Sequence, residues 1–184
     1  QHSCAITSSG GVMCWGDNYY GQLGDDGANR STATPVQVVG LTSGVIALTS
    51  GYFHTCALIS CGGVMCWGRN AFGQLGDGTS KESLTPVVVF GLSSGVTALS
   101  VVYVHTCSLL SSGGMQCWGR NDAGQLGDGT TTQHAVPVDV ADLSSGVRVI
   151  AASYLQTCAI TTANTVQCWG DNSAGQLGNN SLES

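Results

Sequence analysis

Eight of the nine cysteines form two series that recur at nearly constant steps. The first series steps by 52, 51 and 51 residues, and the second follows it at a distance of ten residues throughout. Paired cysteines at fixed spacing can form disulfides or hold zinc. The pairs are Cys4 with Cys14, Cys56 with Cys66, Cys107 with Cys117, and Cys158 with Cys168.

The residues between the paired cysteines favour disulfides. Each pair brackets a turn, such as residues 8–11 in the first copy and 111–114 in the third. A turn centred between them places the two cysteines opposite each other on antiparallel strands, with Cα atoms about 4.5 or 5.5 Å apart. Both separations lie within disulfide reach, whereas the Cys-x-x-Cys knuckles of zinc sites are absent. We predict four disulfides, each in the outer hairpin of its repeat.

Cys61 is left over and aligns with Ser9, Ser112 and Ala163 at the hairpin tip. An odd cysteine in a secreted protein indicates a free reactive thiol or an intermolecular bond. A chance substitution without function is the alternative.

The other groups with chemical potential fit structural roles better. His2, His54 and His105 share one repeat position, so they would lie in different copies of the repeat and could not converge on one metal or substrate. His134 is unrepeated and falls in a polar loop, where we expect a solvated side chain. The segment 77–79 offers one carboxylate, too few for a calcium loop, and reads as a turn cap. No nucleophile elbow or metal-ligand spacing occurs, so we expect no catalytic residue, metal or cofactor.

Two further motifs recur with the cysteines. Each second-series cysteine opens Cys-Trp-Gly, and Gly-Gln-Leu-Gly follows five residues after that glycine. The intact motif Trp-Gly-x-Asn-x-x-Gly-Gln-Leu-Gly-Asp-Gly stands at Trp67–Gly78 and Trp118–Gly129. This pattern resembles the RCC1 repeat family along the whole chain, and the resemblance implies a seven-bladed β-propeller. The chain departs from the family pattern where Val102 and Ser153 replace a glycine and where Gln156 replaces the histidine.

The apolar residues come in short bursts between glycine-rich turns, which predicts an all-β fold. One unit contains four expected strands, at 87–90, 96–100, 105–110 and 115–118. Four strands in about 51 residues are typical of a propeller blade, and fourteen strands make three and a half blades. We divide the chain into a half repeat, residues 1–34, and repeats 35–85, 86–136 and 137–184. A closed propeller typically needs at least about four blades, so we expect a longer parent protein.

The composition of the chain narrows the range of possible functions and locations. Charged residues are 9% of the chain, the net charge is −6, and only five residues are Lys or Arg. That is too little positive charge for a nucleic-acid groove. No apolar run approaches the roughly 20 residues of a membrane helix, so we expect no membrane insertion. Nine cysteines favour an oxidising compartment, and we expect a secreted, extracellular or periplasmic protein.

Positions that break the repeat are the candidates for partner binding. They include Tyr19, Tyr20 and Phe72, just before the Gly-Gln-Leu-Gly turns, because interfaces use aromatic anchors. The alternative is that these rings only cover blade edges. Tyr52, Tyr103 and Tyr154 recur and are read as structural. The further candidates are the loops 28–34, 79–85 and 130–136, and the glycosylation triplets that begin at Asn29 and Asn179.

These observations favour an extracellular protein–protein interaction scaffold rather than an enzyme. The alternative function is a secreted propeller that inhibits an enzyme, as the resemblance to secreted β-lactamase inhibitors implies. A GTPase exchange factor is disfavoured, because its nucleocytoplasmic setting would not preserve eight paired cysteines. Self-association through open blade edges or through Cys61 is a further expected interaction.

Overall fold

The computed structural model of the chain describes residues 1–27 and 30–183. These residues form fourteen β-strands, most of them separated by short turns, with longer connections after β2, β6 and β10. None of them belongs to a helix of the length and apolarity that crossing a membrane requires. The strands are β1 (His2–Ile6), β2 (Val12–Gly16), β3 (Thr32–Gln37), β4 (Val45–Ser50), β5 (His54–Ile59), β6 (Val64–Gly68), β7 (Ser83–Val88), β8 (Val96–Val101), β9 (His105–Leu110), β10 (Met115–Gly119), β11 (His134–Asp139), β12 (Val147–Ala152), β13 (Gln156–Thr161) and β14 (Val166–Gly170).

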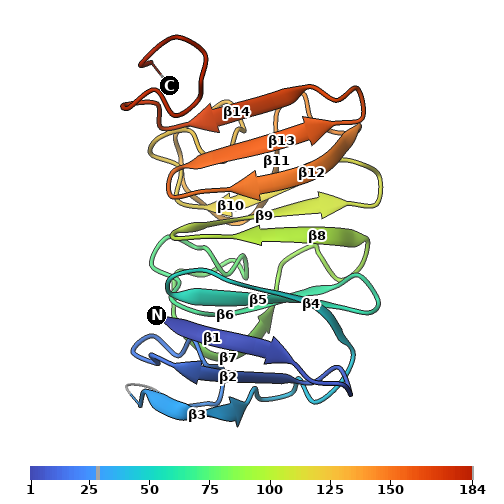
Figure 1. Cartoon of the computed structure of the whole chain (residues 1–184), viewed down its shortest axis with the longest axis vertical. Coiled ribbons are helices and arrows are strands. Elements are labelled where there is room, and N and C mark those ends of the chain that lie inside the picture. The colour runs from blue at the N-terminus through green and yellow to red at the C-terminus, as the bar shows by residue number, and fades with distance from the viewer. Residues whose placement is uncertain (28–29, 184) are drawn as a thin grey trace.

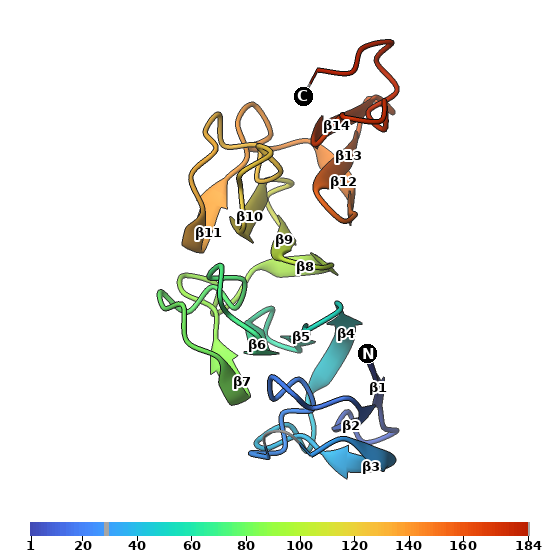
Figure 2. The same ribbon diagram turned by 90° about the vertical axis from the view of Figure 1, so that its left-hand side faces the viewer.

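The strands form four antiparallel sheets, which we number blades 1 to 4. Blade 1 is β1-β2-β3, blade 2 is β4-β5-β6-β7, blade 3 is β8-β9-β10-β11, and blade 4 is β12-β13-β14. Figure 1 shows the blades following one another along the long axis of the molecule. In Figure 2, β4, β8 and β12 lie on one side of this row, while β7 and β11 lie on the other. The all-β propeller architecture and the fourteen strands predicted from the repeat are confirmed.

The strand that follows the Gly-Gln-Leu-Gly segment differs from the prediction in its bounds and in the blade to which it belongs. We expected a strand at residues 87–90 to open a new unit, but β7 covers Ser83–Val88 and pairs with β6, closing blade 2. Pro86 lies inside β7, the outermost strand, where its missing N–H leaves no ladder hydrogen bond unmade. The sequence units and the sheets therefore divide the chain at different points.

The core lies in the spaces between neighbouring blades. Leu23 and Val38 of blade 1 pack in one cluster with Trp67 of blade 2, and all three side chains are fully buried. Leu75 and Trp118 repeat this packing between blades 2 and 3. Full burial of a leucine side chain stabilises a fold by about 1.5–3 kcal/mol. These leucine and tryptophan contacts therefore hold successive blades together, and we call each such interface a seam.

Candidate functional site

All four predicted disulfides are present. In each pair the two cysteines are direct partners across the hairpin, with Cα atoms 4.1 Å apart. This separation is close to that of a non-hydrogen-bonded antiparallel pair. We predicted that each disulfide lies in the outer hairpin of its blade, and this prediction is wrong for blades 2 and 3. In the four-stranded blades 2 and 3 the bond joins the two central strands, as Cys56 on β5 and Cys66 on β6 show between β4 and β7. In the three-stranded blades 1 and 4 the bond joins the middle strand to an edge strand, β1 or β14.

Cys61 is a free and exposed cysteine at the tip of the β5–β6 hairpin. Its Sγ lies 3.7 Å from the backbone oxygen of Ser93. The opposite end of this hairpin is the pair His54 and Gly68. Cys61 therefore lies at one end of blade 2, and the turns next to His54 and Gly68 lie at the other end.

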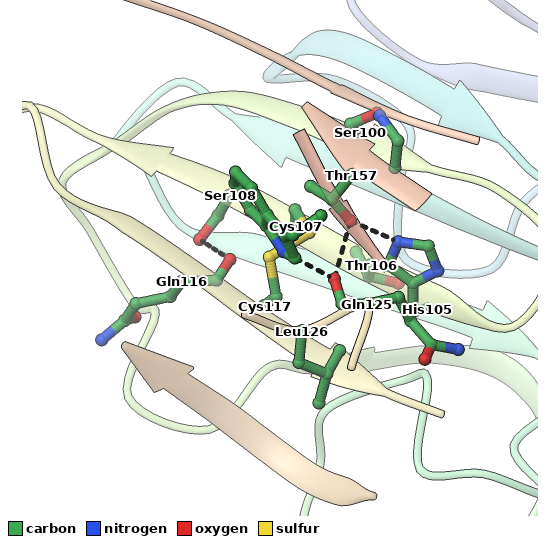
Figure 3. Close-up of a disulfide and its surroundings, with 12 residues drawn as sticks. Ser100, His105, Thr106, Cys107, Ser108, Gln116, Cys117, Gln125, Leu126 and Thr157 are labelled. Atoms are coloured by element: carbon green, nitrogen blue, oxygen red, sulfur yellow. Dashed lines mark hydrogen bonds between the residues drawn. A yellow bond between two sulfur atoms is a disulfide. The ribbon is translucent and has the colours of Figure 1, made fainter. Parts of the chain in front are cut away.

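Each histidine of the repeat hydrogen-bonds into the next blade. Nε2 of His54 is 2.9 Å from Oγ1 of Thr106, and this hydroxyl donates to the backbone oxygen of Gln74 at 3.0 Å. Because the threonine proton is used in that bond, its oxygen accepts from Nε2–H of the histidine. The same relay joins His2, Thr55 and Gln22, and His105, Thr157 and Gln125. Figure 3 shows the last of these relays beside the Cys107–Cys117 disulfide.

The indole N–H of the repeated tryptophan donates to the same carbonyl group. Nε1 of Trp118 donates to the backbone oxygen of Gln74 at 2.9 Å, so this oxygen accepts from both Trp118 and Thr106. A Cβ atom on Gly76 would lie 2.6 Å from Nε1 of Trp118. The last glycine of Gly-Gln-Leu-Gly is therefore required for the indole of the next blade to approach.

Burial keeps the seam histidines neutral. It lowers the pKa of His54 from 6.5 to about 3, with smaller contributions from His105 and His2. Burial likewise lowers the pKa of His105 and of His2 to about 4. Nδ1 of all three is buried without a hydrogen-bond partner, so a second proton there would have no acceptor. Each histidine serves its own seam, and the three do not converge on one site.

The asparagine and aspartate of the motif cap the long turn after the tryptophan. Oδ1 of Asn70 accepts from the backbone N of Leu75 at 2.9 Å, and its amide donates to Asp77. Asp77 also accepts from the backbone N of Thr79 at 2.9 Å. The turn-cap interpretation of segment 77–79 therefore agrees with the structure. His134 differs from its prediction as a solvated loop residue, because it begins β11 and lies 3.0 Å from Oδ2 of Asp128.

A connected array of aromatic rings lies at the other end of the blades, on the surface away from Cys61. Tyr19, Tyr20 and Phe53 are neighbours, with ring centroids 4.7 and 5.3 Å apart. Phe53 contacts Tyr52 and Tyr103, and Tyr103 contacts Tyr154 at 4.7 Å. The array extends from blade 1 to blade 4, and the exposed fractions of Tyr19, Tyr52 and Tyr154 are 62%, 51% and 55%. We call it, together with Arg69, Phe72 and Arg120, the aromatic face.

Two arginines lie against this array. The guanidinium carbon of Arg69 is 5.0 Å from the ring centre of Tyr20, 5.2 Å from that of Phe53 and 5.9 Å from that of Phe72. Arg120 lies 5.2 Å from the ring centre of Phe72 and forms an ion pair with Asp122. Such cation–π contacts hold a guanidinium against the rings and fix its orientation.

A shallow groove of about 490 Å³ runs beside the tyrosines. Its walls are Tyr52, Tyr103 and Tyr154 together with the ends of β4, β8 and β12. A Cβ atom on Gly51 would lie 1.8 Å from the backbone oxygen of Val102. Gly51 is therefore required for this close approach of blades 2 and 3.

Sequence comparison identifies the family. The profile of the Regulator of chromosome condensation (RCC1) repeat matches residues 9–58, 61–109 and 112–160, and a second RCC1 repeat profile matches 45–74, 96–125 and 147–176. The chain belongs to the RCC1 repeat family. The ultraviolet-B receptor UVR8 of Arabidopsis thaliana is 31% identical over 182 residues, which cover 97% of this chain and 41% of the receptor. The probable E3 ubiquitin-protein ligase HERC4 of Homo sapiens is 33% identical over 189 residues, which cover 98% of this chain and 17% of the ligase.

Solved structures give the same assignment. Human WBSCR16 matches with a TM-score of 0.86 and 25% identity, over 100% of this chain and 48% of that protein. Yeast RCC1 (Prp20), in its complex with Kap60, matches with a TM-score of 0.85 and 20% identity, over 100% of this chain and 45% of the neighbour. The chain therefore spans less than half the length of each of these four proteins.

The structure of these RCC1 repeats brings some predicted residues together and adds others. Tyr19, Tyr20 and Phe72 all lie on the aromatic face. Phe53 and Arg69 were missed, although the register pairs His54 with Gly68 and so places the residues beside them at one end of the blade. Tyr52, Tyr103 and Tyr154, read as structural because they recur, line the groove instead.

Only one of the two glycosylation triplets begins within the described residues. Asn29 and the start of the loop 28–34 lie outside the described residues. Asn179 is exposed, and its side-chain oxygen accepts from the backbone N of Ser181 at 3.1 Å. It occupies the turn-cap position that Asp77 fills in blade 2.

Proposed function

We propose that this RCC1-repeat chain is a protein-binding scaffold of an extracellular or periplasmic protein, with a binding rather than a catalytic role. The observation that carries the proposal is the unbroken array of rings from Tyr19 to Tyr154 across all four blades. Exposed tyrosines supply large contact areas at low entropic cost and are enriched in the centres of protein interfaces.

The family supports binding in general terms. The yeast RCC1 structure is a complex with Kap60, and a second yeast structure is described with binding of Prp20p to Gsp1p and histones. Propellers of this fold therefore bind proteins, while the identity of the partner does not transfer to this chain.

The disulfides support an oxidising location. Eight of nine cysteines are paired within single blades. Such bonds persist in secreted and periplasmic proteins and are rare in the cytosol and nucleus. This argument also disfavours a role in nucleotide exchange on a nuclear GTPase. A secreted enzyme inhibitor is the special case in which the bound partner is an enzyme.

The test uses the native extracellular fraction and two baits, the chain and its triple variant Y52S/Y103S/Y154S. We expect a partner that is retained by the first bait and lost from the second, and that binds the purified chain in a binary titration. An assay of that partner, if it is an enzyme, separates inhibitor from scaffold. Equal retention of every protein by both baits would contradict the proposal.

Location has its own measurement. Alkylation of intact cells, followed by mass spectrometry of the native protein, should find modification at Cys61 alone. Alkylation of the paired cysteines would place the protein in a reducing compartment and refute the extracellular assignment.

A further inference from the structure

Arg69 is a charged group on the aromatic face without a charged partner. Its guanidinium is held against Tyr20, Phe53 and Phe72, and no ion pair joins it to any described residue. Arginine carries five N–H donors and stays charged at every physiological pH. Rings satisfy the charge in part, but they accept none of these donors as a carboxylate does.

Arg120 shows what the same repeat position does when a carboxylate is present. Arg69 and Arg120 are equivalent residues in successive blades, and Arg120 pairs with Asp122. The equivalent of Asp122 in blade 2 is Ala71, which has no polar group. Blade 2 therefore keeps the arginine of this pair and lacks its acid.

A neighbouring donor in blade 2 also lacks an acceptor. In blades 1 and 4 the side-chain amide of the motif glutamine donates to an aspartate, at 3.1 Å from Gln22 to Asp17 and 2.8 Å from Gln176 to Asp171. Arg69 and Arg120 occupy this aspartate position in blades 2 and 3, and Nε2 of the buried glutamine has no partner in either blade, at Gln74 and at Gln125. The position that holds a carboxylate in blades 1 and 4 thus holds only donors in blades 2 and 3, and of these two arginines only Arg120 has a carboxylate beside it, that of Asp122.

The acids of the same face are already used by the chain itself. Asp17 accepts from Gln22, Asp122 from Arg120, and Asp171 from Gln176. Arg69 is therefore the charge on this face that is open to an external anion, among the described residues. Phe53 connects Arg69 to the groove, because its ring contacts the guanidinium as well as Tyr52 and Tyr103 in the groove wall. The groove has room for apolar side chains.

We propose that the aromatic face binds a peptide segment of the partner in which an aspartate or glutamate lies next to apolar side chains, with its carboxylate on Arg69. This inference rests on the proposed scaffold function and specifies the chemistry of its partner. The carboxylate accepts from the guanidinium, and the apolar neighbours pack on Tyr52, Tyr103 and Tyr154.

The charge balance selects this occupant over other anions. Phosphate groups, nucleic acids and anionic membranes are bound by clusters of Arg and Lys, whereas Arg120 is already paired with Asp122. A run of many acids would be repelled by the net charge of −6. One carboxylate within an apolar segment avoids that repulsion and uses the rings.

The experiment is a selection of random dodecapeptides displayed on phage against the immobilised 184-residue chain. Parallel selections use R69Q and R148Q; Arg148 is an exposed arginine on β12 that serves as the matched control. We expect peptides with Asp or Glu beside aromatic or aliphatic residues from the chain and from R148Q, and loss of that motif from R69Q. Absence of any enriched peptide would count against the proposal, as would enrichment without carboxylates.

The best peptide is then synthesised and titrated by fluorescence anisotropy. Replacing its Asp or Glu by the amide should weaken binding about tenfold or more, because hydrogen bonds to charged groups are the stronger class. R69Q should lose a similar factor, and R69K should lose part of it because lysine lacks the planar fork. The amide peptide keeps the test valid even if R69Q folds poorly. Equal affinity for acid and amide peptides would overturn the proposal.

The two proposals fail in different ways. If Y52S/Y103S/Y154S loses the native partner while selected peptides carry no acid, the scaffold function stands and the carboxylate assignment is wrong. If the tyrosine variant retains every partner, the scaffold function itself is wrong.

Discussion

Trp118 and Tyr154 are both aromatic residues that recur in the repeat, and they have opposite environments. Trp118 is fully buried in the seam between blades 2 and 3, where its indole N–H donates to Gln74. Tyr154 has an exposed fraction of 55% and lies at the end of the aromatic array. Recurrence therefore fixes where a residue lies in the blade, but it does not determine whether the side chain is buried.

The seams and the aromatic face also differ in how much their polar and charged residues vary from blade to blade. The three seams have the same donors and acceptors, because each threonine and tryptophan bonds to one carbonyl of the preceding blade. On the aromatic face one repeat position holds Asp17, Arg69, Arg120 and Asp171 in turn. The seam tolerates little variation, whereas the face varies in charge from blade to blade.

The largest expected effect is at the seam. Trp118→Ala should lower the free energy of unfolding by about 3–5 kcal/mol, because it leaves a cavity in a fully buried cluster. Urea denaturation of the oxidised protein measures this value. Tyr154→Ala is the matched control, with an expected loss below about 1 kcal/mol. Equal losses for both variants would contradict the distinction between seam and face.

The disulfides should rank second. The double variant C107S/C117S should lose about 3 kcal/mol, because the bond closes a short loop and restricts the unfolded chain. Cys61→Ser is the control and should change stability by no more than about 0.5 kcal/mol. Thiol titration of the denatured, unreduced chain should find one free cysteine; five or more would refute the disulfide assignment.

Acid should weaken the seams next. In the unfolded chain His54 takes a proton near pH 6.5, whereas in the folded protein burial lowers its pKa to about 3. Below pH 6.5 the unfolded state thus binds more protons, and stability falls as the pH falls toward 3. His54 alone should cost about 2 kcal/mol between about pH 7 and pH 5, since one pKa unit corresponds to about 1.4 kcal/mol.

His54→Gln separates this effect from general acid sensitivity. Glutamine stands at the equivalent position in blade 4, as Gln156, and cannot titrate in this range. The variant should show a weaker dependence of unfolding free energy on pH between about 7 and 5. An unchanged slope would show that His54 is not a buried neutral group in the folded protein.

The repeat made much of this structure predictable. Cysteines ten residues apart around a turn gave the four disulfides, because the geometry of a hairpin leaves little freedom at that spacing. The assignment of strands to blades was not predictable in the same way. Pro86 looks like the start of a strand, and only tertiary pairing shows that β7 closes blade 2.

Only some residues of the aromatic face could be predicted, because the others meet through strand pairing rather than through differences between repeats. Tyr19, Tyr20 and Phe72 break the repeat and could be found by comparing copies. Arg69 and Phe53 are 16 residues apart and meet only because β5 and β6 return the chain to the same end of the blade. Comparison of repeat copies detects differences between blades, but it does not detect contacts between different positions.

The smallest expected effect on stability belongs to Tyr19. Its ring has an exposed fraction of 62% and contacts Tyr20 at the edge of the array. Tyr19→Ala should change the free energy of unfolding by less than about 0.5 kcal/mol, as surface substitutions usually do. If Tyr19 anchors the partner, the same variant should weaken partner binding by more than about tenfold, because interface anchors commonly contribute at least about 2 kcal/mol. Trp118→Ala has the opposite profile, since it lowers stability without removing a ring from the face. A Tyr19→Ala protein that loses stability but keeps its partner would reverse the roles of seam and face in blade 1.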